Sequence, residues 1–304
     1  MELSVVVPTL NGRDRLAASL DSLAAHASDA EVVVVNGPSA DGTTGMVRDR
    51  DDVDVLVEIS ARNVNVARNA GIEVADGDVV AMLGYDHLIE ADWQTTVRDA
   101  VSTGADVVTG PLRRTVKGGA TSAEAERRNI ADRSVTYLNG RNVAFRADVL
   151  EDLDGFDEYL ETGGSRDASH RLGGMNVEVV WRPEMGVRRQ EPTAADGGRE
   201  ARDWGWKYRA LAYRLTKNYG PRPTVVRRTL SHAASDARRT LTEVVRGEAT
   251  PSGWVGNGRD VVGGMATGAS DGIVARAKDR SDTRNPNGLT ARADRAVAKY
   301  DWRE

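Results

Sequence analysis

The chain contains no cysteine among its 304 residues. It can therefore form no disulfide framework, no thiolate metal site and no cysteine nucleophile, which excludes several classes of secreted domain and several catalytic mechanisms. It also lacks an apolar run of the roughly 20 residues that cross a bilayer. Residues 1–8 have no basic segment or small-residue cleavage site and lead directly into a predicted strand, so we expect no secretory signal.

Lysine and aromatic residues are also scarce. Five of the 41 basic residues are lysine and the other 36 are arginine, while aromatic residues make up 5% of the chain. The length fits one large or two small globular domains. Charge is unevenly distributed: residues 1–181 hold 17 basic and 31 acidic groups, residues 182–246 hold 15 and 7, and residues 247–304 hold 9 and 8. The middle block therefore has the largest excess of positive charge.

The first 110 residues alternate short valine-rich runs with segments of helical spacing. The runs that predict strands occupy residues 3–7, 31–36, 53–59, 78–83 and 106–109. The helical segments lie between them, at residues 13–25, 64–75 and 91–101, with a short one that follows the turn at 37–42 and runs toward residue 49. This alternation predicts an α/β fold with a mostly parallel sheet flanked by helices. Ligands of such sheets bind beyond the carboxyl ends of the strands.

Polar loops follow three of the predicted strands, at residues 8–13, 36–43 and 84–87. Residues 62–71, which begin a predicted helix, contain two arginines and three asparagines, an unusually polar start for a packing helix. Because the carboxyl ends of parallel strands meet at one edge of a sheet, these loops converge. The sequence therefore predicts a polar site at this edge.

Taken in order, these motifs resemble those of family 2 glycosyltransferases. The similar segments are residues 4–11, 36–43, 66–71 with 75–80, 139–146 and 155–158. The resemblance covers roughly residues 1–185 and is strongest to archaeal, particularly haloarchaeal, members that assemble lipid-linked glycans. It implies a GT-A (Rossmann-like) domain over residues 1–190, followed by a helical C-terminal extension over residues 191–304.

The resemblance also implies inverting transfer of a sugar from a nucleotide-sugar donor. Such a reaction needs a carboxylate to deprotonate the acceptor and a divalent metal, Mg²⁺ or Mn²⁺, to offset the charge of the departing diphosphate, with arginine near the phosphates as well. Carried over to this sequence, the donor-binding residues are Pro8, Thr9, Asn11, Asn36, Asp41, Arg68, Asn69 and Asp86, with Asp86 also the metal ligand. A helix-capping role for Asp41 and a solvated helix face for Arg68 and Asn69 are equally open at this point.

Two positions depart from the family pattern. The turn after the second strand has Asn36 and Gly37 where the family has two aspartates, so a carboxylate expected to contact the nucleobase is missing. The Asp-x-Asp position, residues 84–86, keeps only its second aspartate, Asp86. One carboxylate can hold Mg²⁺ when phosphates and waters fill the other positions, so Asp86 can still be a metal ligand. The alternative is that Asp86 is an ordinary turn residue. We interpret the neighbouring His87 as a surface-loop residue.

The catalytic base is expected in residues 162–171. Aligning Arg166 and Asp167 with the family's Glu-Asp pair makes Asp167 the base; counting back from Arg171 instead places Ser165 at that position. Asp167 is the only carboxylate in the segment, so the resemblance assigns it as the catalytic residue, with the N-cap of a helix over 168–172 as the alternative. His170 is a second candidate base or a polar residue on that helix.

Residues 203–215 interleave aromatic and basic side chains. Such a pattern suits the interface of an anionic membrane, so we expect peripheral membrane contact through residues 199–228. Packing of a helix with a solvated charged face is the main alternative. Stacking on single-stranded nucleic acid is disfavoured, and no nucleic-acid partner is expected. Residues 225–299 are predicted to form further helices.

The hypothesis that joins these observations is a glycosyltransferase at the cytoplasmic face of the cell membrane. By analogy with the haloarchaeal members, it would add a hexose or hexuronic acid to a dolichyl phosphate-linked oligosaccharide for protein N-glycosylation, including that of an S-layer. The alternatives are a non-catalytic glycosyltransferase-like subunit and a sugar nucleotidyltransferase. A dinucleotide-dependent oxidoreductase is disfavoured, because no G-x-G-x-x-G follows the first strand.

Overall fold

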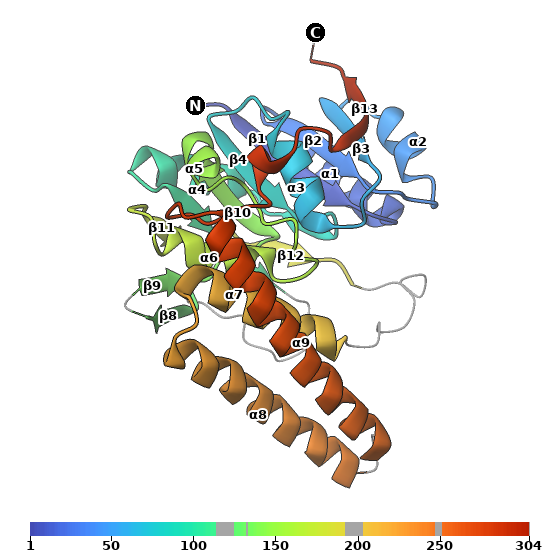
Figure 1. The fold of residues 1–304 in the computed structure, drawn as a ribbon. Helices are drawn as coiled ribbons and strands as arrows, with labels where there is room; N and C mark the ends of the chain where they lie inside the picture. The colour runs from blue at the N-terminus through green and yellow to red at the C-terminus, as the bar shows by residue number, and fades with distance from the viewer. Residues whose placement is uncertain (114–124, 132, 192–202, 247–250, 304) are drawn as a thin grey trace. The chain divides into compact units, whose positions relative to one another are not determined.

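The computed structural model describes the chain except for residues 114–124, 132, 192–202, 247–250 and 304. The chain divides into two compact units (Figure 1). The first unit comprises Met1–Thr193 together with Asn287–Glu304, and the second comprises Ala194–Pro286. The sheets belong to the first unit, and the second is helical.

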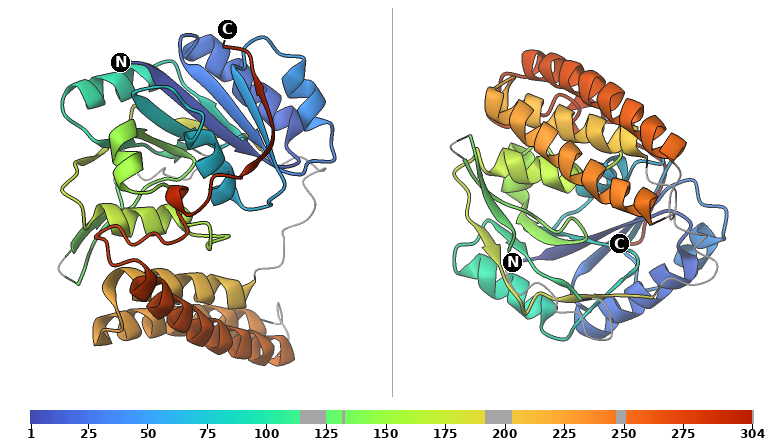
Figure 2. Two further views of the ribbon diagram at one scale, coloured as in Figure 1. Left: turned by 45° about the horizontal axis from the view of Figure 1, so that its top comes forward. Right: turned by 90° about the horizontal axis from the view of Figure 1, so that it is seen from below.

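An eight-stranded mixed sheet forms the centre of the first unit, in the order β11-β6-β10-β4-β1-β2-β3-β13 (Figure 2). Its strands are β1 (Leu3–Thr9), β2 (Glu31–Asn36), β3 (Val55–Ile59), β4 (Val79–Leu83), β6 (Val107–Thr109), β10 (Asn142–Arg146), β11 (Val179–Trp181) and β13 (Ala296–Asp301). Strands β4, β1, β2 and β3 are mutually parallel, as are β6 and β11, whereas β10 and β13 run antiparallel to their neighbours. The predicted mostly parallel α/β sheet is confirmed.

Smaller sheets and helices complete this unit. The small sheets are β5 (His87–Ile89) with β12 (Val187–Arg189) and β7 (Leu112–Arg113), and β8 (Arg127–Ile130) with β9 (Arg133–Thr136). The helices are α1 (Arg13–His26), α2 (Thr43–Arg48), α3 (Val64–Ile72), α4 (Trp93–Ser102), α5 (Ala147–Asp152) and α6 (Gly164–Leu172), and a short 3-10 turn, η2, spans Leu289–Ala291.

Alternation of valines along the strands builds a core on each face of the sheet. Val5 and Val7 of β1 pack with α1 and α4 on one face, while Val6 packs with α3, α5 and α6 on the other. All three valines are fully buried. Successive side chains of a strand point to opposite faces, so an all-apolar strand needs helices on both sides. This double cover leaves the strand ends as the place where polar loops gather.

The described residues of the second unit form the helices α7 (Trp204–Tyr219), α8 (Pro223–Val245) and α9 (Pro251–Lys278). Helices α7 and α9 lie side by side (Figure 2). Gly264 and Gly268 of α9 face the α7 backbone so closely that an added Cβ would lie 2.1 Å from the carbonyl oxygens of Gly205 and Arg209, respectively. Among the helices described, none has both the length and the hydropathy needed to cross a bilayer.

The end of the chain differs from the predicted helical extension. Residues 287–304 belong to the first unit, where β13 pairs antiparallel with β3 (Figure 1). The backbone N–H of Trp302 continues the contact by donating to the carbonyl of Asp54 (2.9 Å). The helical part of the predicted extension is thus confined to residues before 287, because the last strand completes an edge of the sheet formed by residues far earlier in the chain.

Candidate functional site

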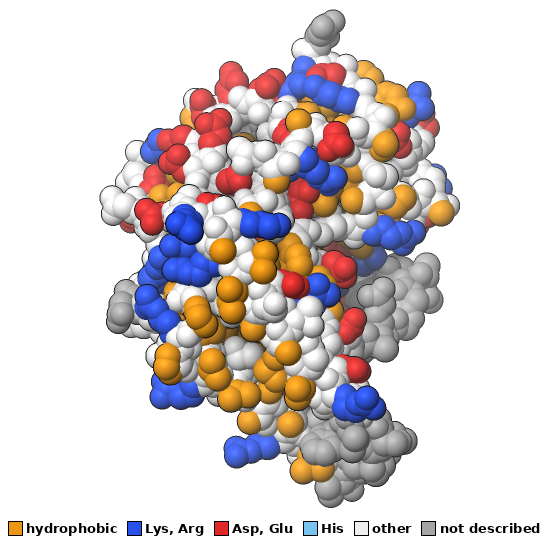
Figure 3. Space-filling model, viewed as in Figure 1, with side chains coloured by type: hydrophobic (Ala, Val, Ile, Leu, Met, Phe, Trp, Pro, Cys, Tyr) orange, Lys and Arg blue, Asp and Glu red, His pale blue; other side chains and the backbone are white. Residues whose placement is uncertain are grey.

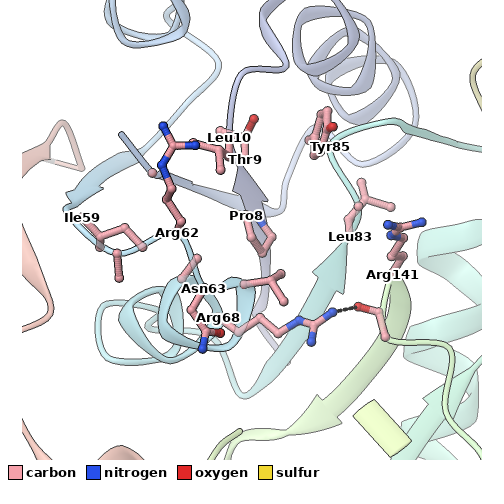
Figure 4. A pocket seen from close by; sticks show the side chains of 16 residues that line it. Pro8, Thr9, Leu10, Ile59, Arg62, Asn63, Arg68, Leu83, Tyr85 and Arg141 are labelled. Carbon is pink, nitrogen blue, oxygen red and sulfur yellow. Dashed lines mark hydrogen bonds between the residues drawn. The ribbon is translucent and has the colours of Figure 1, made fainter. Parts of the chain in front are cut away.

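A cavity of about 340 Å³ opens at the carboxyl ends of β1 to β4 (Figure 4). Its walls come from the loops after these strands, from the start of α3 and from the turn before β10. The lining residues are Pro8, Thr9, Leu10, Gly37, Ile59, Ala61, Arg62, Asn63, Val64, Ala67, Arg68, Leu83, Gly84, Tyr85, Gly140 and Arg141. The volume and the position at the strand ends are typical of small-molecule sites in α/β folds.

Three arginines surround this cavity. Figure 4 shows Arg62 and Arg141 on opposite sides of it, with Arg68 extending between them toward the carbonyl of Gly140. Arg68 donates to that carbonyl (2.6 Å) and to Oδ1 of Asn65 (2.9 Å). Within the described part of the chain, none of the three arginines forms an ion pair with a carboxylate. The cavity therefore presents positive charge, although the charge of Arg141 also acts on the nearby carboxylate of Asp86.

Two polar atoms beside the cavity are buried without a hydrogen-bond partner among the described residues: Nε of Arg68 and Oγ1 of Thr9. The Arg68 side chain is 7% exposed, and burial, together with the like charge of Arg141, lowers its pKa to about 10. A buried cation without a counter-charge is costly in free energy. An anionic ligand in the cavity would offset that cost.

Of the predicted donor-binding residues, Pro8, Thr9 and Arg68 line the cavity, and the others do not. Asn11, in the left-handed region at φ 50°, accepts a hydrogen bond from the backbone N–H of Ala40 (2.8 Å). Asp41 accepts from the backbone N–H groups of Arg13 (3.0 Å) and Thr43 (3.2 Å), the first residues of α1 and α2. These two side chains fix the loops after β1 and β2 against each other.

Asn36 and Asn69 also make contacts within the protein. Asn36 is buried and accepts a hydrogen bond from Oγ of Ser39 (2.7 Å). Asn69, on α3, accepts from the N–H of Phe156 and donates to its carbonyl and to Oε1 of Glu158, each at 2.8 Å. Asn69 is fully buried, so neither ligand contact nor a solvated helix face describes it. It attaches α3 to the segment around residue 157.

Asp86 lies among cations and outside the cavity lining. Its carboxylate is 2.8 Å from Nδ1 of His87, 3.1 Å from Nε of Arg189 and 3.9 Å from Nη1 of Arg15, and the side chain is 4% exposed. Burial raises the pKa of Asp86, but His87, Arg141 and Arg189 outweigh it and hold the pKa well below its usual range. Asp86 is thus an ionised carboxylate whose charge the protein itself neutralises.

These contacts do not fit the metal site predicted at Asp86. The cavity lining contains no carboxylate and no imidazole, and the described residues include no group of three His, Asp or Glu side chains that could hold a metal ion. His87 is fully buried, contrary to its interpretation as a surface-loop residue, and its Nε2 has no hydrogen-bond partner among the described residues. Arg189 reaches Asp86 because β12 pairs with β5. Nothing in the sequence around Asp86 indicates this contact.

Asp167, the predicted catalytic base, is fully buried within the first turn of α6. Its Oδ2 accepts from Nε of Arg171, one turn later, at 2.8 Å. Asp167 does not line the cavity. Helix α6 begins at Gly164 after the N-cap residue Gly163, so Asp167 is not the predicted N-cap either. A base must reach a bound acceptor, so the assignment of Asp167 stays a prediction that this enclosed ion pair does not favour.

Ser165, which the second alignment places at the position of the base, lies in the same helix as Asp167. Ser165 lies next to the cavity, because an added Cβ on Gly140 would be 2.6 Å from its Oγ. His170, the other candidate, is buried outside the cavity lining and packs edge-to-face against Tyr137, with ring centres 5.6 Å apart. Neither the carboxylate of Asp167 nor the imidazole of His170 therefore lines the cavity.

The aromatic side chains predicted to contact a membrane are largely enclosed. On α7, Tyr208 and Tyr213 are buried, and the hydroxyl of Tyr208 donates to Oδ2 of Asp236 on α8 (2.8 Å). Residues 199–202 of the predicted segment lie outside the described residues. The exposed apolar side chains of this unit lie instead on α8 and α9, among them Leu230 and Val262 (Figure 3).

Sequence reasoning did not assign Arg62 and Arg141 to the site, although both lie in segments that it singled out. Arg62 opens the polar helix start at residues 62–71, and Arg141 lies within residues 139–146. Both arginines lie outside the positions that the family resemblance assigns to the donor. The clearer signal was arginine at both segments, because its fixed array of donors suits phosphate.

The family model described as Glycosyl transferase family 2 matches residues 4–154. Two curated relatives come from Haloferax volcanii. The glycosyltransferase AglE is 30% identical over 176 residues, which are 53% of this chain and 58% of AglE. A glucosyl-dolichyl phosphate glucuronosyltransferase is 27% identical over 185 residues, 55% of this chain and 59% of that protein. The matches thus span less than two thirds of these relatives.

Solved structures show the same fold. Staphylococcus aureus TarS 1–349 in complex with UDP-GlcNAc has a TM-score of 0.61 at 18% identity, covering 93% of this chain and 90% of TarS 1–349. The mannosyltransferase PcManGT from Pyrobaculum calidifontis, in complex with GDP-Man and Mn²⁺, has a TM-score of 0.55 at 17% identity, covering 92% and 88%. The sheet and its flanking helices are therefore a GT-A-like fold with helices near the C-terminus.

Proposed function

We propose that this chain, a member of glycosyl transferase family 2 through its residues 4–154, transfers a sugar from a nucleotide-sugar donor to a lipid-linked saccharide. The observation that carries the proposal is the arginine-surrounded cavity at the ends of β1 to β4, which lies within the matched domain and its immediate surroundings. Arginine binds phosphate oxygens through paired, charge-assisted hydrogen bonds. A nucleoside diphosphate supplies the anion that the cavity lacks.

In the proposed reaction an acceptor hydroxyl attacks the anomeric carbon of the donor sugar. One carbon–oxygen bond forms as the bond to the diphosphate breaks, so the configuration inverts and the diphosphate leaves with the bonding electron pair. Arg68 and Arg141 would hold the charge that develops on the leaving group, an effect that is strongest when the donors are already in position. The acceptor proton passes to a base, for which Asp167 stays the predicted residue.

The names of the two Haloferax relatives support the finer parts of the proposal. One relative is a glucosyl-dolichyl phosphate glucuronosyltransferase and the other is named a glycosyltransferase. We therefore propose a hexose or hexuronic acid as the transferred sugar and a dolichyl phosphate-linked oligosaccharide of protein N-glycosylation as the acceptor. The place of reaction would be the cytoplasmic face of the cell membrane, where a nucleotide sugar and a lipid-linked acceptor meet.

Membrane contact would fall to the face of the second unit formed by α8 and α9. A groove of about 950 Å³ runs between these helices, lined chiefly by apolar side chains that include Leu230, Val262 and Met265. Leu230 is 55% exposed and Val262 is 65% exposed. The exposed Arg238 and Arg239 lie on the same helix as Leu230. Exposed apolar side chains on a helix that also carries cations suit an anionic lipid surface.

Transfer is tested by incubating the purified chain with UDP- and GDP-linked hexoses and hexuronic acids and a dolichyl phosphate-linked saccharide, with product detection by mass spectrometry. The proposal expects one donor to extend the lipid-linked saccharide by one sugar. Failure of every donor to bind, measured by calorimetry, would refute the nucleotide-sugar assignment and favour a non-catalytic subunit. Binding without transfer would refute the acceptor alone.

The membrane contact is tested by sedimentation with vesicles of phosphatidylglycerol and phosphatidylcholine. We expect Leu230→Asp and Val262→Asp to reduce the bound fraction severalfold. The matched control is Val297→Asp on β13, another exposed valine (69% exposed) that lies outside the second unit. Equal binding of all three variants and the unchanged chain would show that the α8–α9 face does not contact lipid.

A further inference from the structure

We infer that arginines of this chain, and not a divalent metal held by its carboxylates, neutralise the diphosphate of the bound donor. The residues concerned are Arg62, Arg68 and Arg141, which together surround the cavity. This inference rests on the proposed function, because it takes a nucleoside diphosphate as the ligand. It departs from the use of Mg²⁺ or Mn²⁺ that the sequence resemblance implies.

The first argument is the balance of charge inside the cavity. Its lining contains three arginines and no acidic side chain. Arg68 is more than nine-tenths buried, and its Nε has no hydrogen-bond partner in the described part of the chain. A diphosphate brings several negative charges and several acceptor oxygens, so it matches both the charge and the free donor. A metal bound to protein carboxylates would have none to bind here.

The second argument is the state of Asp86, the one aspartate at the expected metal-binding position. A metal ion at Oδ2 of Asp86 would displace Nε of Arg189, which lies at 3.1 Å. It would also meet the charge of Arg15, at 3.9 Å. Bringing a divalent cation into a cluster of cations is unfavourable at these distances. Oδ2 of Asp86 is thus occupied by arginine, while its Oδ1 faces Nδ1 of His87 and has no hydrogen-bond partner among the described residues.

The third argument is the close approach of Arg68 to the turn before β10. An added Cβ on Gly140 would lie 3.0 Å from Nη2 of Arg68 and 2.6 Å from Oγ of Ser165. A side chain at position 140 would press on the guanidinium, which here donates to the Gly140 carbonyl (2.6 Å). The guanidinium also lies 4.9 Å from the ring centre of Phe156. Arg68 is therefore held in place before any ligand binds.

The test is titration calorimetry of the full chain with UDP, GDP and pyrophosphate, first with excess EDTA and then with Mg²⁺ or Mn²⁺. The inference expects one of these anions to bind in EDTA, with a Kd that changes less than threefold when metal is added. Binding that appears only with metal, or tightens tenfold or more, overturns the inference and leaves the proposed function intact. Absence of binding under every condition overturns the proposed function and the inference with it.

Variants identify the residues. Arg62 and Arg141 are exposed, so Arg62→Ala and Arg141→Ala are expected to fold, and each should weaken binding in EDTA about tenfold to hundredfold. Arg141→Lys should restore part of the loss, because it keeps the charge without the paired donors. The control is Arg98→Ala, which removes a surface pair with Asp29 outside the cavity. Unchanged affinity in both cavity variants would overturn the inference.

Discussion

Asp167 and Arg171 form an ion pair that solvent does not reach, since both side chains are 0% exposed. Arg171 also donates to the carbonyls of Leu153 and Gly155 and so connects α6 to the segment after α5. Removing one member of such a pair leaves the other charge buried and unpaired. Asp167 therefore contributes to stability first, whatever its part in the reaction.

We expect Asp167→Ala to lower the free energy of unfolding by about 3–5 kcal/mol, because Arg171 would lose its buried counter-charge. Urea denaturation followed by circular dichroism measures this. The control is Ser165→Ala, a change at the edge of the cavity that leaves the pair intact and should keep stability within about 1 kcal/mol. A normally stable Asp167→Ala protein that binds donor but transfers no sugar would instead establish Asp167 as the base.

Asn69 offers a second test at this scale. Asn69→Leu would remove three hydrogen bonds to Phe156 and Glu158, and we expect a loss of about 1–3 kcal/mol in stability. Nucleotide affinity should stay within twofold of the unchanged chain, because Asn69 does not line the cavity. A weakened Kd at unchanged melting temperature would contradict this structural role. Calorimetry and thermal denaturation on the same sample separate the two outcomes.

At the scale of single residues, the sequence predicted the loops better than the roles within them. Pro8, Thr9 and Arg68 line the cavity, and their place at a strand end or helix start follows from local pattern, whereas their contact with a donor stays a prediction. The neutralisation of Asp86 could not be predicted in this way. Its partner Arg189 is 103 residues away in sequence and reaches it only through the pairing of β12 with β5.

Helices α7 and α9 illustrate what a glycine does within an element. Gly268 and Gly263 both lie inside α9, but an added Cβ on Gly268 would be 2.1 Å from the carbonyl oxygen of Arg209 on α7, whereas at Gly263 it meets nothing within 4 Å. Both substitutions to alanine gain about 1 kcal/mol of helix propensity. Only Gly268→Ala must also push the two helices apart.

We therefore expect Gly268→Ala to destabilise the helical unit, with a lower melting temperature followed at 222 nm. Gly263→Ala should be neutral or slightly stabilising, since it adds propensity without a clash. The pair isolates the contact with α7 from any general effect of replacing glycine. Equal melting temperatures for the two variants would mean that α7 and α9 do not pack at the distance described.

At the scale of elements, the repeating βα pattern was enough to predict β1 to β4 and α1 to α4 within a few residues. The apolar periodicity that defines each of them is local. Strand β13 was predicted as part of a helical region instead. Its six residues become a strand through pairing with β3, about 240 positions earlier in the chain, and local pattern does not report such a partner.

The whole molecule depends on the return of residues 287–304 to the first unit. Strand β13 covers the edge of β3, and a sheet edge left open is a site for aggregation. Arg295 strengthens the attachment: it is fully buried and pairs with both Glu73 and Glu158. Glu158 belongs to the segment that Asn69 also holds, so the C-terminal segment and α3 meet at one cluster of hydrogen bonds.

Arg295 and its neighbour Arg292 both pair with Glu158, and they differ in burial: Arg295 is 0% exposed and Arg292 is 39% exposed. We expect Arg295→Ala to cost about 3–5 kcal/mol, because Glu73 and Glu158 lose a buried cation. Arg292→Ala should cost less than about 1 kcal/mol, as for an ordinary surface pair.

Denaturant unfolding of the two variants, with light scattering to detect association through the β3 edge, measures this difference. The expected result is a lower midpoint and earlier scattering for Arg295→Ala alone. If both variants unfold like the unchanged chain, the C-terminal segment is not anchored through Arg295, and the sheet must hold β13 through its backbone pairing. If both variants lose stability equally, the strength of these ion pairs does not depend on the burial of the arginine. It then depends on Glu158, the partner that both arginines share.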